Sequence, residues 1–219
     1  MYVENLKLIN FRNYNDLEIH FNKNQNIIYG NNAQGKTNII EALYYATCGR
    51  SHRTKKDKEL IKWENENSYI KTLVKKSGVD INIDIKISQN KKKAITINNS
   101  PIKKIGELFG NLNSVIFSPE DLDLVKQGPL ERRKFIDIGI SQIKPNYFYN
   151  LQQYYISLNQ RNALLKDIRK NAKYKEMIDI WDNNIIEIGS KIMYYRYEYL
   201  IKIAELAKNI HREITNEEF

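Results

Sequence analysis

The sequence contains little cysteine, proline or glycine. Its 219 residues include one cysteine, four prolines and nine glycines. The single Cys48 excludes a disulfide within the chain and any cysteine-rich metal site. It suits a reducing compartment, and its place in a helical apolar pattern predicts buried packing. So few prolines and glycines leave no low-complexity linker between segments.

Histidine is scarce, and long apolar runs are missing. His20, His52 and His211 share no ligand spacing, so we predict no transition-metal site. The first residues, Met1 to Asn5, do not combine a basic start with an apolar core, which excludes a signal peptide. No apolar run approaches the ~20 residues that a membrane helix needs. We therefore expect a soluble, cytoplasmic protein.

Negative charge is in the minority. The chain has 35 lysines and arginines against 26 aspartates and glutamates, which gives a net charge of +9 and a sequence pI near 9.3. Such a surplus favours a polyanionic partner, either nucleic acid or an anionic membrane surface. A basic but merely solvated surface is the alternative.

The first half of the chain is typical of β-structure with one early helix. Apolar residues at positions 6, 8 and 11, and again at 17, 19 and 21, predict two strands joined near Asn13–Asn15. A short apolar strand is expected over residues 26–29. From Thr37 the apolar spacing becomes helical. Strict alternation over residues 79–87 predicts a strand with one wet face, between turns at Ser77-Gly78 and Asn98-Asn99.

The second half is helical. Pro145 is expected to open one helix. A longer apolar stripe then steps by three or four residues from Ile178 to Ile210, as in the seam of an antiparallel helical pair. At 1.5 Å per residue this stripe extends roughly 50 Å. Tyrosines at 194, 195, 197 and 199 either stack on bases or, as we favour, pack between the helices.

One motif carries specific chemistry. The pattern G-x-x-x-x-G-K-[ST] is matched by Gly30-Asn31-Asn32-Ala33-Gln34-Gly35-Lys36-Thr37. The glycines let successive N–H groups face phosphate oxygens, and Lys36 adds a positive charge at the β- and γ-phosphates. The Thr37 hydroxyl is a ligand for Mg²⁺, and the helix N-terminus favours an anion. The motif predicts a nucleoside triphosphate bound with Mg²⁺.

Hydrolysis requires a second element, an acidic residue after about four apolar ones. Asp137 and Asp179 each follow only two apolar residues, and no other segment fits better. Residues 156–160 faintly resemble an ABC signature but have no glycine, so we interpret them as helix only. The sequence thus contains half of an ATPase, and we name no catalytic residue.

Several segments together resemble a known family. Leu6 to Tyr14, with the motif and Asn38 after it, resemble the start of SMC-like ABC ATPases. Residues 38–43, 50–54 with 59–61, and 115–137 are similar to the bacterial RecF family of DNA replication and repair proteins. Members of this family are longer, with their signature motif and Walker B acid in a C-terminal portion that we expect to lie beyond Phe219.

The resemblance implies an α/β fold. Residues 1–143 would be the N-terminal part of an ABC-type P-loop ATPase head with a β-rich subdomain, and residues 144–219 an incomplete α-helical arm. It also implies ATP with Mg²⁺, ATP-dependent homodimerisation, and binding to duplex DNA and single/double-strand junctions. The RecR and RecO mediators would be partners in loading recombinase at gaps and supporting the SOS response.

The resemblance also implies roles for individual residues. The nucleotide would be held by Gly30, Asn31, Asn32, Ala33, Gln34, Gly35, Lys36, Thr37 and Asn38, with Thr37 on the metal. Arg12 takes the place of an arginine near the nucleotide in SMC-like heads; a surface-loop arginine is the alternative. ABC heads use a glutamine as a Mg²⁺ and water sensor, and the matching stretch, Ser118 to Asp121, has none.

Three basic clusters are candidates for DNA contact. They comprise Arg50 with His52 and Arg53, then Lys91-Lys92-Lys93, and then Arg132-Arg133-Lys134. Such residues bind phosphates without reading sequence. The lysine triplet has an alternative as a solvated hairpin tip, and Arg132 and Arg133 as ion-pair partners of Glu131 or Asp137.

Other P-loop classes fit less well. A GTPase would need Asn-Lys-x-Asp, and Asn22-Lys23-Asn24-Gln25 lacks the aspartate. A nucleotide kinase would need a lid with arginines, and none is evident. A different SMC-like protein with a long coiled coil would need hundreds more helical residues.

A prediction follows from the missing acid. We expect the purified 219-residue chain to release no phosphate from Mg-ATP above background. Turnover that disappears when Lys36 is replaced by alanine would show that a catalytic carboxylate had been overlooked.

Overall fold

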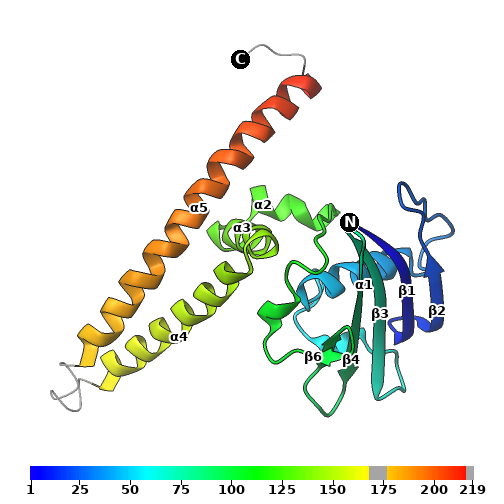
Figure 1. Cartoon of the computed structure of the whole chain (residues 1–219), viewed down its shortest axis with the longest axis horizontal. Helices are drawn as coiled ribbons and strands as arrows, with labels where there is room; N and C mark the ends of the chain where they lie inside the picture. The colour runs from blue at the N-terminus through cyan, green and yellow to red at the C-terminus, as the bar shows by residue number, and fades with distance from the viewer. Residues whose placement is uncertain (168–176, 216–219) are drawn as a thin grey trace. The chain divides into compact units, whose positions relative to one another are not determined.

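The computed structural model describes residues 1–167 and 177–215. The chain divides into two compact units, Met1–Ser118 and Pro119–Phe219 (Figure 1). The sequence predicted a domain boundary after residue 143. The helix over Pro129–Ile143 packs against the two helices that follow it and lies within the second unit; the boundary after residue 143 stays a prediction. Assignment of residues 1–143 to an ATPase head stays a prediction.

The first unit is built on one antiparallel sheet of six strands in the order β2-β1-β3-β4-β5-β6. The two strands predicted around residues 6–11 and 17–21 are present, and so is the strand predicted over residues 79–87. The turns at Ser77-Gly78 and Asn98-Asn99 are also present. The strands are β1 (Tyr2–Phe11), β2 (Tyr14–His20), β3 (Asn67–Lys76), β4 (Val79–Ser88), β5 (Ala94–Ile97) and β6 (Ser100–Pro101).

Period-two alternation sets which face of the sheet is buried. In β4, Ile81, Ile83, Ile85 and Ile87 are buried while the residues between them stay partly or fully exposed. Ile85 pairs with Ile70 of β3, so neighbouring strands present the same apolar face. Helix α1 (Lys36–Cys48) covers that face and adds Ile39, Ala42, Tyr45 and Ala46 to the core (Figure 1).

The remaining helices are short in the first unit and long in the second. The 3-10 turn η1 (Asp57–Leu60) buries Leu60 under the sheet, and η2 (Ile105–Leu108) buries Leu108. In the second unit lie η3 (Pro119–Leu122), α2 (Asp123–Lys126), α3 (Pro129–Ile143), α4 (Pro145–Asp167) and α5 (Ile178–Thr215).

The strand predicted over residues 26–29 does not form. Residues 25–30 form no strand, and the side chains of Ile27 and Tyr29 are 77% and 90% exposed. A strand requires a hydrogen-bonded neighbour, and none of the six strands runs beside this segment. The apolar segment Val115–Phe117 is also without regular structure, and its Val115 and Phe117 are largely exposed.

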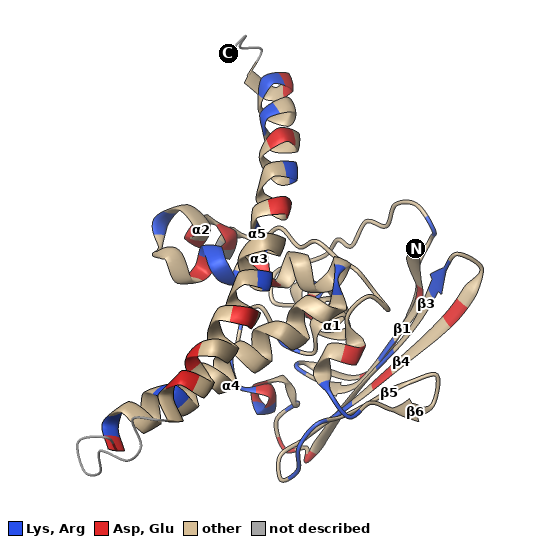
Figure 2. Ribbon diagram, turned by 60° about the vertical axis from the view of Figure 1, so that its left-hand side comes forward, with Lys and Arg blue, Asp and Glu red and all other residues tan. Residues whose placement is uncertain are grey.

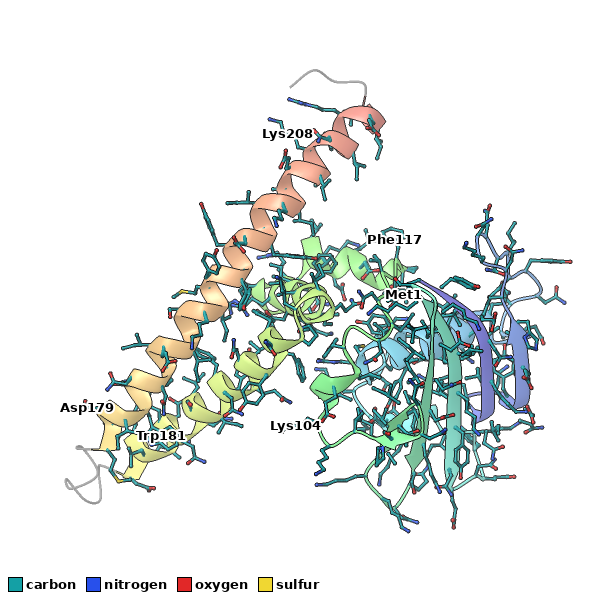
Figure 3. The ribbon with its side chains drawn as sticks, viewed as in Figure 1. Met1, Lys104, Phe117, Asp179, Trp181 and Lys208 are labelled. Atoms are coloured by element: carbon teal, nitrogen blue, oxygen red, sulfur yellow. The ribbon has the colours of Figure 1, made fainter. Side chains whose placement is uncertain are left out.

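Helices α4 and α5 form the expected antiparallel pair. Arg161 near the end of α4 pairs with Asp182 near the start of α5, and Tyr147 near the start of α4 meets Arg196 further along α5. Figure 3 marks Trp181 and Asp179 at the beginning of α5 and Lys208 near its other end. The pair is closed by a small apolar core that contains Ile140, Tyr147, Ile188, Ile192, Tyr195 and Tyr199.

The apolar stripe of α5 is covered over only part of its length. Helix α5 has 38 residues and α4 has 23, so α4 is too short to cover the whole length of α5. Leu206 and Ile210, which the sequence placed in the seam, are 61% and 55% exposed. Tyr195 and Tyr199 pack in the core, as favoured, whereas Tyr194 and Tyr197 are exposed. No helix of the described residues is both long and apolar enough for a membrane span.

Candidate functional site

The predicted phosphate loop lies at the N-terminus of α1. Residues Gly30 to Gly35 form an open turn, and the helix begins at Lys36. Gly30, Ala33 and Gly35 adopt φ values of 144°, 62° and 96°, the left-handed range that glycine takes without strain. In the described chain the N–H groups of residues 32–35 donate to no protein acceptor. N–H groups without a protein acceptor, in a turn just before a helix, are available to phosphate oxygens.

Lys36 closes over this turn. Its Nζ donates to the carbonyl oxygens of Gly30 and Asn31, each at 2.7 Å. The ammonium group is therefore held against the backbone of the loop by two of its carbonyl oxygens. Thr37 is exposed at the first turn of α1, and its hydroxyl is available for a metal. The donor set fits Mg-ATP: backbone N–H groups and lysine for phosphate, and a hydroxyl for Mg²⁺.

The turn between β1 and β2 is hydrogen-bonded to the phosphate loop and to the first turn of α1. Asn13 Nδ2 and Tyr14 Oη donate to the carbonyl oxygen of Gln34 at 3.2 and 3.4 Å, and Asn38 Nδ2 donates to Asn13 Oδ1 at 2.8 Å. A Cβ atom on Gly35 would lie 2.6 Å from Asn13 Oδ1 and 2.7 Å from Tyr14 Oη. The φ of 96° favours glycine at position 35, and a side chain there would also displace the hydrogen-bonded ends of Asn13 and Tyr14.

Arg12 is oriented by a fully buried carboxylate. Its Nε and Nη2 donate to the two oxygens of Glu41 at 3.0 and 2.7 Å, the bidentate geometry that arginine prefers. Its Nη1 donates to the carbonyl oxygen of Glu59 at 3.0 Å. The Glu41 side chain is 0% exposed. Arg12 is thus a paired arginine in the β1–β2 turn; its contact with nucleotide stays a prediction.

Arg53 approaches the same carboxylate from another segment. Its Nη1 lies 3.5 Å from Glu41 Oε2 and donates to Asn38 Oδ1 at 3.1 Å, while Ser51 Oγ donates to Glu41 at 2.5 Å. Burial raises the pKa of the Glu41 carboxyl, but the hydrogen bonds from Arg12 and Ser51 and the charges of Arg12 and Arg53 outweigh burial and lower the pKa below its ordinary value. Glu41 is therefore ionised at neutral pH.

The two arginines of the first basic cluster are both exposed but differ in their contacts. Arg53 lies beside Glu41 and donates to Asn38, whereas Arg50 contacts neither side chain. His52 lies edge-on to the Tyr44 ring, with centroids 5.4 Å apart. DNA contact by Arg50 and Arg53 stays a prediction, and Arg53 has a second candidate role beside the phosphate loop.

The second cluster is divided in the same way. Lys91 and Lys92 are exposed near the β4–β5 turn. Lys93 is not part of a solvated tip: its Nζ donates to the carbonyl oxygen of Gly49 and to Asp57, and it lies 5.2 Å from the centre of the Tyr45 ring. This lysine connects the strand to the C-terminus of α1, a contact that periodicity in the sequence does not reveal.

The third cluster lies in the second unit, on α3. The alternative considered for Arg132 and Arg133, ion pairs with Glu131 or Asp137, is not found among the described residues. Glu131 pairs with Lys134 at 3.2 Å, and Asp137 pairs with Arg196 at 2.8 Å. Arg132 donates instead to the carbonyl oxygens of Leu124 and Gln127. The side chain of Glu120, in the stretch matched to the glutamine sensor, lies outside the described residues.

Glu41 and Ser51 were missed by reasoning from the sequence. The available signal was a glutamate at position 41 within the apolar face of α1, because a lone acidic residue there must be paired if it is buried. Its partners lie 29 residues before it and 10 and 12 residues after it. Only folding brings these segments together.

Replacing Lys36 by alanine removes a charged donor without changing the core. A hydrogen bond to a charged group contributes about 1.5–3 kcal/mol, which corresponds to a loss of roughly 10- to 100-fold in affinity. We expect that loss for Mg-ATP, measured by titration with a fluorescent ATP analogue, with an unchanged thermal midpoint. Lys23→Ala, at an exposed lysine just before the loop, is the control. Equal affinities for Lys36→Ala and wild type would overturn the loop's assignment.

Replacing Glu41 by glutamine leaves two arginines without their buried anion. Breaking a buried pair costs about 3–5 kcal/mol, and partial exposure of Arg12 reduces the expected loss to about 2–3 kcal/mol. Because ionised Glu41 has a lowered pKa, its contribution is full above pH 4.5 and is lost as pH falls through the folded-state value.

Urea unfolding at several pH values tests this expectation. The difference in unfolding free energy between wild type and Glu41→Gln should shrink below pH 4.5. Glu18→Gln, which breaks the exposed Lys7–Glu18 pair, is the control and should show a much smaller change. A difference that is constant with pH would contradict the assigned ionisation.

Comparison with known proteins agrees with this geometry. The model of a family described as "AAA domain" matches residues 5–218. The DNA replication and repair protein RecF of Clostridium tetani is 52% identical over 217 residues, which are 99% of this chain and 59% of that protein. RecF of Ruminiclostridium cellulolyticum is 51% identical over 216 residues, 98% of this chain and 58% of its own length.

Solved structures give the same result. The structure of the recombination mediator protein RecF-ATP in the RecFOR pathway matches with a TM-score of 0.93 and 38% identity, over 99% of this chain and 58% of that one. An SMC head bound to the winged-helix domain of ScpA matches with a TM-score of 0.51 and 20% identity, over 76% of this chain and 59% of its own, and shares the fold alone.

The expected α/β fold of a P-loop ATPase head is confirmed. The chain spans about 59% of the length of the curated relatives that it matches. On the family match over nearly its whole length, the ~50% identity to proteins of one name and the shared structure, this chain belongs to the RecF family.

Proposed function

We propose that this chain is the nucleotide-binding portion of an ATP-gated DNA-binding protein of recombinational repair and replication-fork maintenance. One observation supports this most directly: a phosphate loop with free N–H groups and a positioned lysine, in a chain that matches the RecF-ATP structure over 99% of its length. ATP is the nucleotide proposed, with Mg²⁺ at Thr37. Bound Mg²⁺ would neutralise charge on the phosphate oxygens.

The described residues suggest a division of labour. N–H groups of the loop and Lys36 bind the phosphates, while Asn13 and Tyr14 fix the loop through the Gln34 carbonyl oxygen. Glu41 holds Arg12 and Arg53 at the same end of α1, so that their unused donors are close to an incoming anion. We propose that both arginines contact the nucleotide phosphates, which extends the expectation for Arg12 to Arg53.

The wider activity concerns the full-length relatives. We propose that ATP joins two copies of the longer protein on duplex DNA or at a single/double-strand junction, with hydrolysis resetting the dimer. By family membership, RecR and RecO are the proposed partners, in loading recombinase at gaps and in supporting the SOS response. The matching solved structures are of a recombination mediator of the RecFOR pathway, which supports this proposal.

The experiment compares this chain with the full-length Clostridium tetani relative. Fluorescence anisotropy with labelled duplex DNA is measured over a salt series, with and without Mg-ATP. We expect ATP-dependent, strongly salt-dependent binding by the relative, since contacts with phosphates release counterions. The 219-residue chain should bind more weakly and without a response to ATP. Absence of DNA binding by the relative under all conditions would overturn the proposal.

A further inference from the structure

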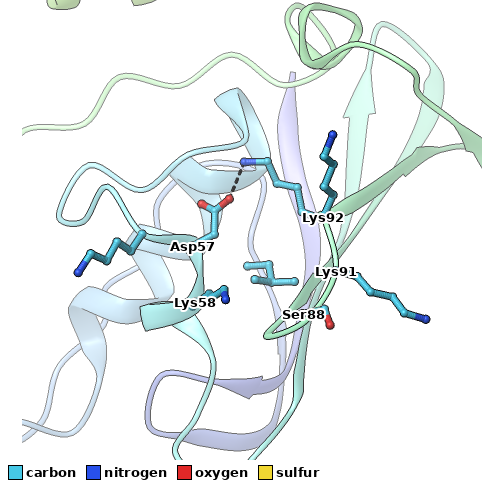
Figure 4. A pocket seen from close by; sticks show the side chains of 8 residues that line it. Asp57, Lys58, Ser88, Lys91 and Lys92 are labelled. Atoms are coloured by element: carbon cyan, nitrogen blue, oxygen red, sulfur yellow. Dashed lines mark hydrogen bonds and ion pairs between the residues drawn. The ribbon is translucent and has the colours of Figure 1, made fainter.

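A lysine-lined pocket lies in the first unit, away from the phosphate loop. It has a volume of about 640 Å³ and is bounded by residues 56–58, at the start of η1, and by the end of β4 with the turn that follows (Figure 4). Its lining consists of Lys56, Asp57, Lys58, Ile87, Ser88, Lys91, Lys92 and Lys93. We call it the lysine pocket.

The lysine pocket is separate from the nucleotide site. Lys93 attaches its wall to the carbonyl oxygen of Gly49, which caps the C-terminus of α1, whereas the phosphate loop lies at the N-terminus of that helix. Helix α1 has 13 residues, so its two ends are about 20 Å apart at 1.5 Å per residue. A triphosphate at the loop does not reach the pocket.

Lys93 builds the wall and is not available to a ligand. Its Nζ pairs with Asp57 at 2.9 Å, donates to Tyr45 Oη at 3.3 Å, and lies over the Tyr45 ring. These contacts fix the β4–β5 turn against α1 and η1. They also neutralise the only acidic side chain that lines the pocket.

The other four lysines leave a concentrated positive charge. Lys56, Lys58, Lys91 and Lys92 are exposed. Lys56 reaches Glu59 only at 4.0 Å, a surface pair of little strength. In the described part of the chain, Lys58, Lys91 and Lys92 form no ion pair. Figure 2 shows lysine and arginine on the loops at this end of the sheet, and Figure 4 labels Lys58, Lys91 and Lys92 among the side chains that line the pocket.

The chemistry of the lining selects the ligand. Lysines are flexible point charges that grip phosphates, and the lining offers no aromatic ring on which a base stacks. The pocket is open and larger than one phosphate group, so it suits several successive phosphates. We propose that the lysine pocket binds the sugar-phosphate backbone of DNA, independently of base sequence. This inference rests on the proposed function, that the protein binds DNA, and it specifies where.

The test removes two pocket lysines and compares a charge-matched control. Lys91→Ala/Lys92→Ala is measured against Lys23→Ala/Lys103→Ala, which removes two exposed lysines of the same unit that do not line the pocket. Duplex binding by the 219-residue chain is followed by anisotropy across a salt series. The logarithm of the DNA-binding constant falls with the logarithm of salt concentration by about 0.9 per phosphate contact. Loss of two contacts should therefore reduce the magnitude of this salt slope by about 1.8 in the pocket variant and by almost nothing in the control.

A second measurement separates the possible failures. Affinity for a fluorescent ATP analogue should be unchanged in both variants, because the loop is at the other end of α1. Suppose that the wild-type chain binds DNA. If the salt slope then decreases equally in both variants, or does not decrease in the pocket variant, the lysine pocket does not contact DNA. If wild-type chain and the full-length relative both fail to bind DNA, the proposed function fails with it.

Lysine acetylation followed by mass spectrometry gives a positional readout. Duplex DNA is expected to protect Lys58, Lys91 and Lys92 and to leave Lys23 and Lys103 reactive. Inorganic polyphosphate is the second probe. Protection by polyphosphate without protection by DNA would assign the pocket to free phosphate chains and overturn the proposal.

Discussion

The carboxylate of Glu41, which has no contact with water, holds together the segments on which the nucleotide site depends. It lies on α1 and receives hydrogen bonds from Arg12 at the end of β1 and from Ser51 after the helix. An unpaired buried charge would cost several kcal/mol, so these partners are obligatory once the helix packs on the sheet. The segment carrying Arg12 continues into Asn13 and Tyr14, which contact the phosphate loop. One buried charge thereby fixes loop, helix and sheet together.

Helix α1 carries different chemistry at its two ends. Its N-terminus has unpaired N–H groups and the positive end of the helix dipole, which favour a phosphate. At its C-terminus the Gly49 carbonyl oxygen receives the Lys93 ammonium, a cation at the negative end. Burial and the nearby Asp57 raise the pKa of the Tyr45 hydroxyl, so this phenol stays protonated beside the lysine. The rigid packing of α1 keeps the two ends at a constant separation.

The second unit uses the same device in a smaller core. Asp137 is nearly buried and receives Arg196 from α5 and the Tyr147 hydroxyl from α4. Burial and the hydrogen bond to Asp137 raise the pKa of Tyr147, so its hydroxyl is protonated and a donor at neutral pH. In both units, therefore, a carboxylate buried with an arginine sets how neighbouring elements meet. These pairs define register, because a shifted packing would leave the charges unpaired.

The sequence alone determined what depends on near neighbours. The alternation in β4, the turn at Ser77-Gly78, the start of α1 at the glycine–lysine motif and the antiparallel pair of α4 and α5 were all predicted, because each is set by residues close in the chain. The motif also predicted the loop residues Gly30 to Thr37, since N–H groups, lysine and hydroxyl come from one continuous segment. Tertiary structure decided what depends on distant residues. In the folded chain Lys93 donates to the Gly49 carbonyl oxygen, and Arg12 and Arg53 pair with Glu41. Ile27 and Tyr29 are exposed in a segment that forms no strand. An ion pair or a strand requires a partner in space, and sequence spacing does not say which partner folding will supply.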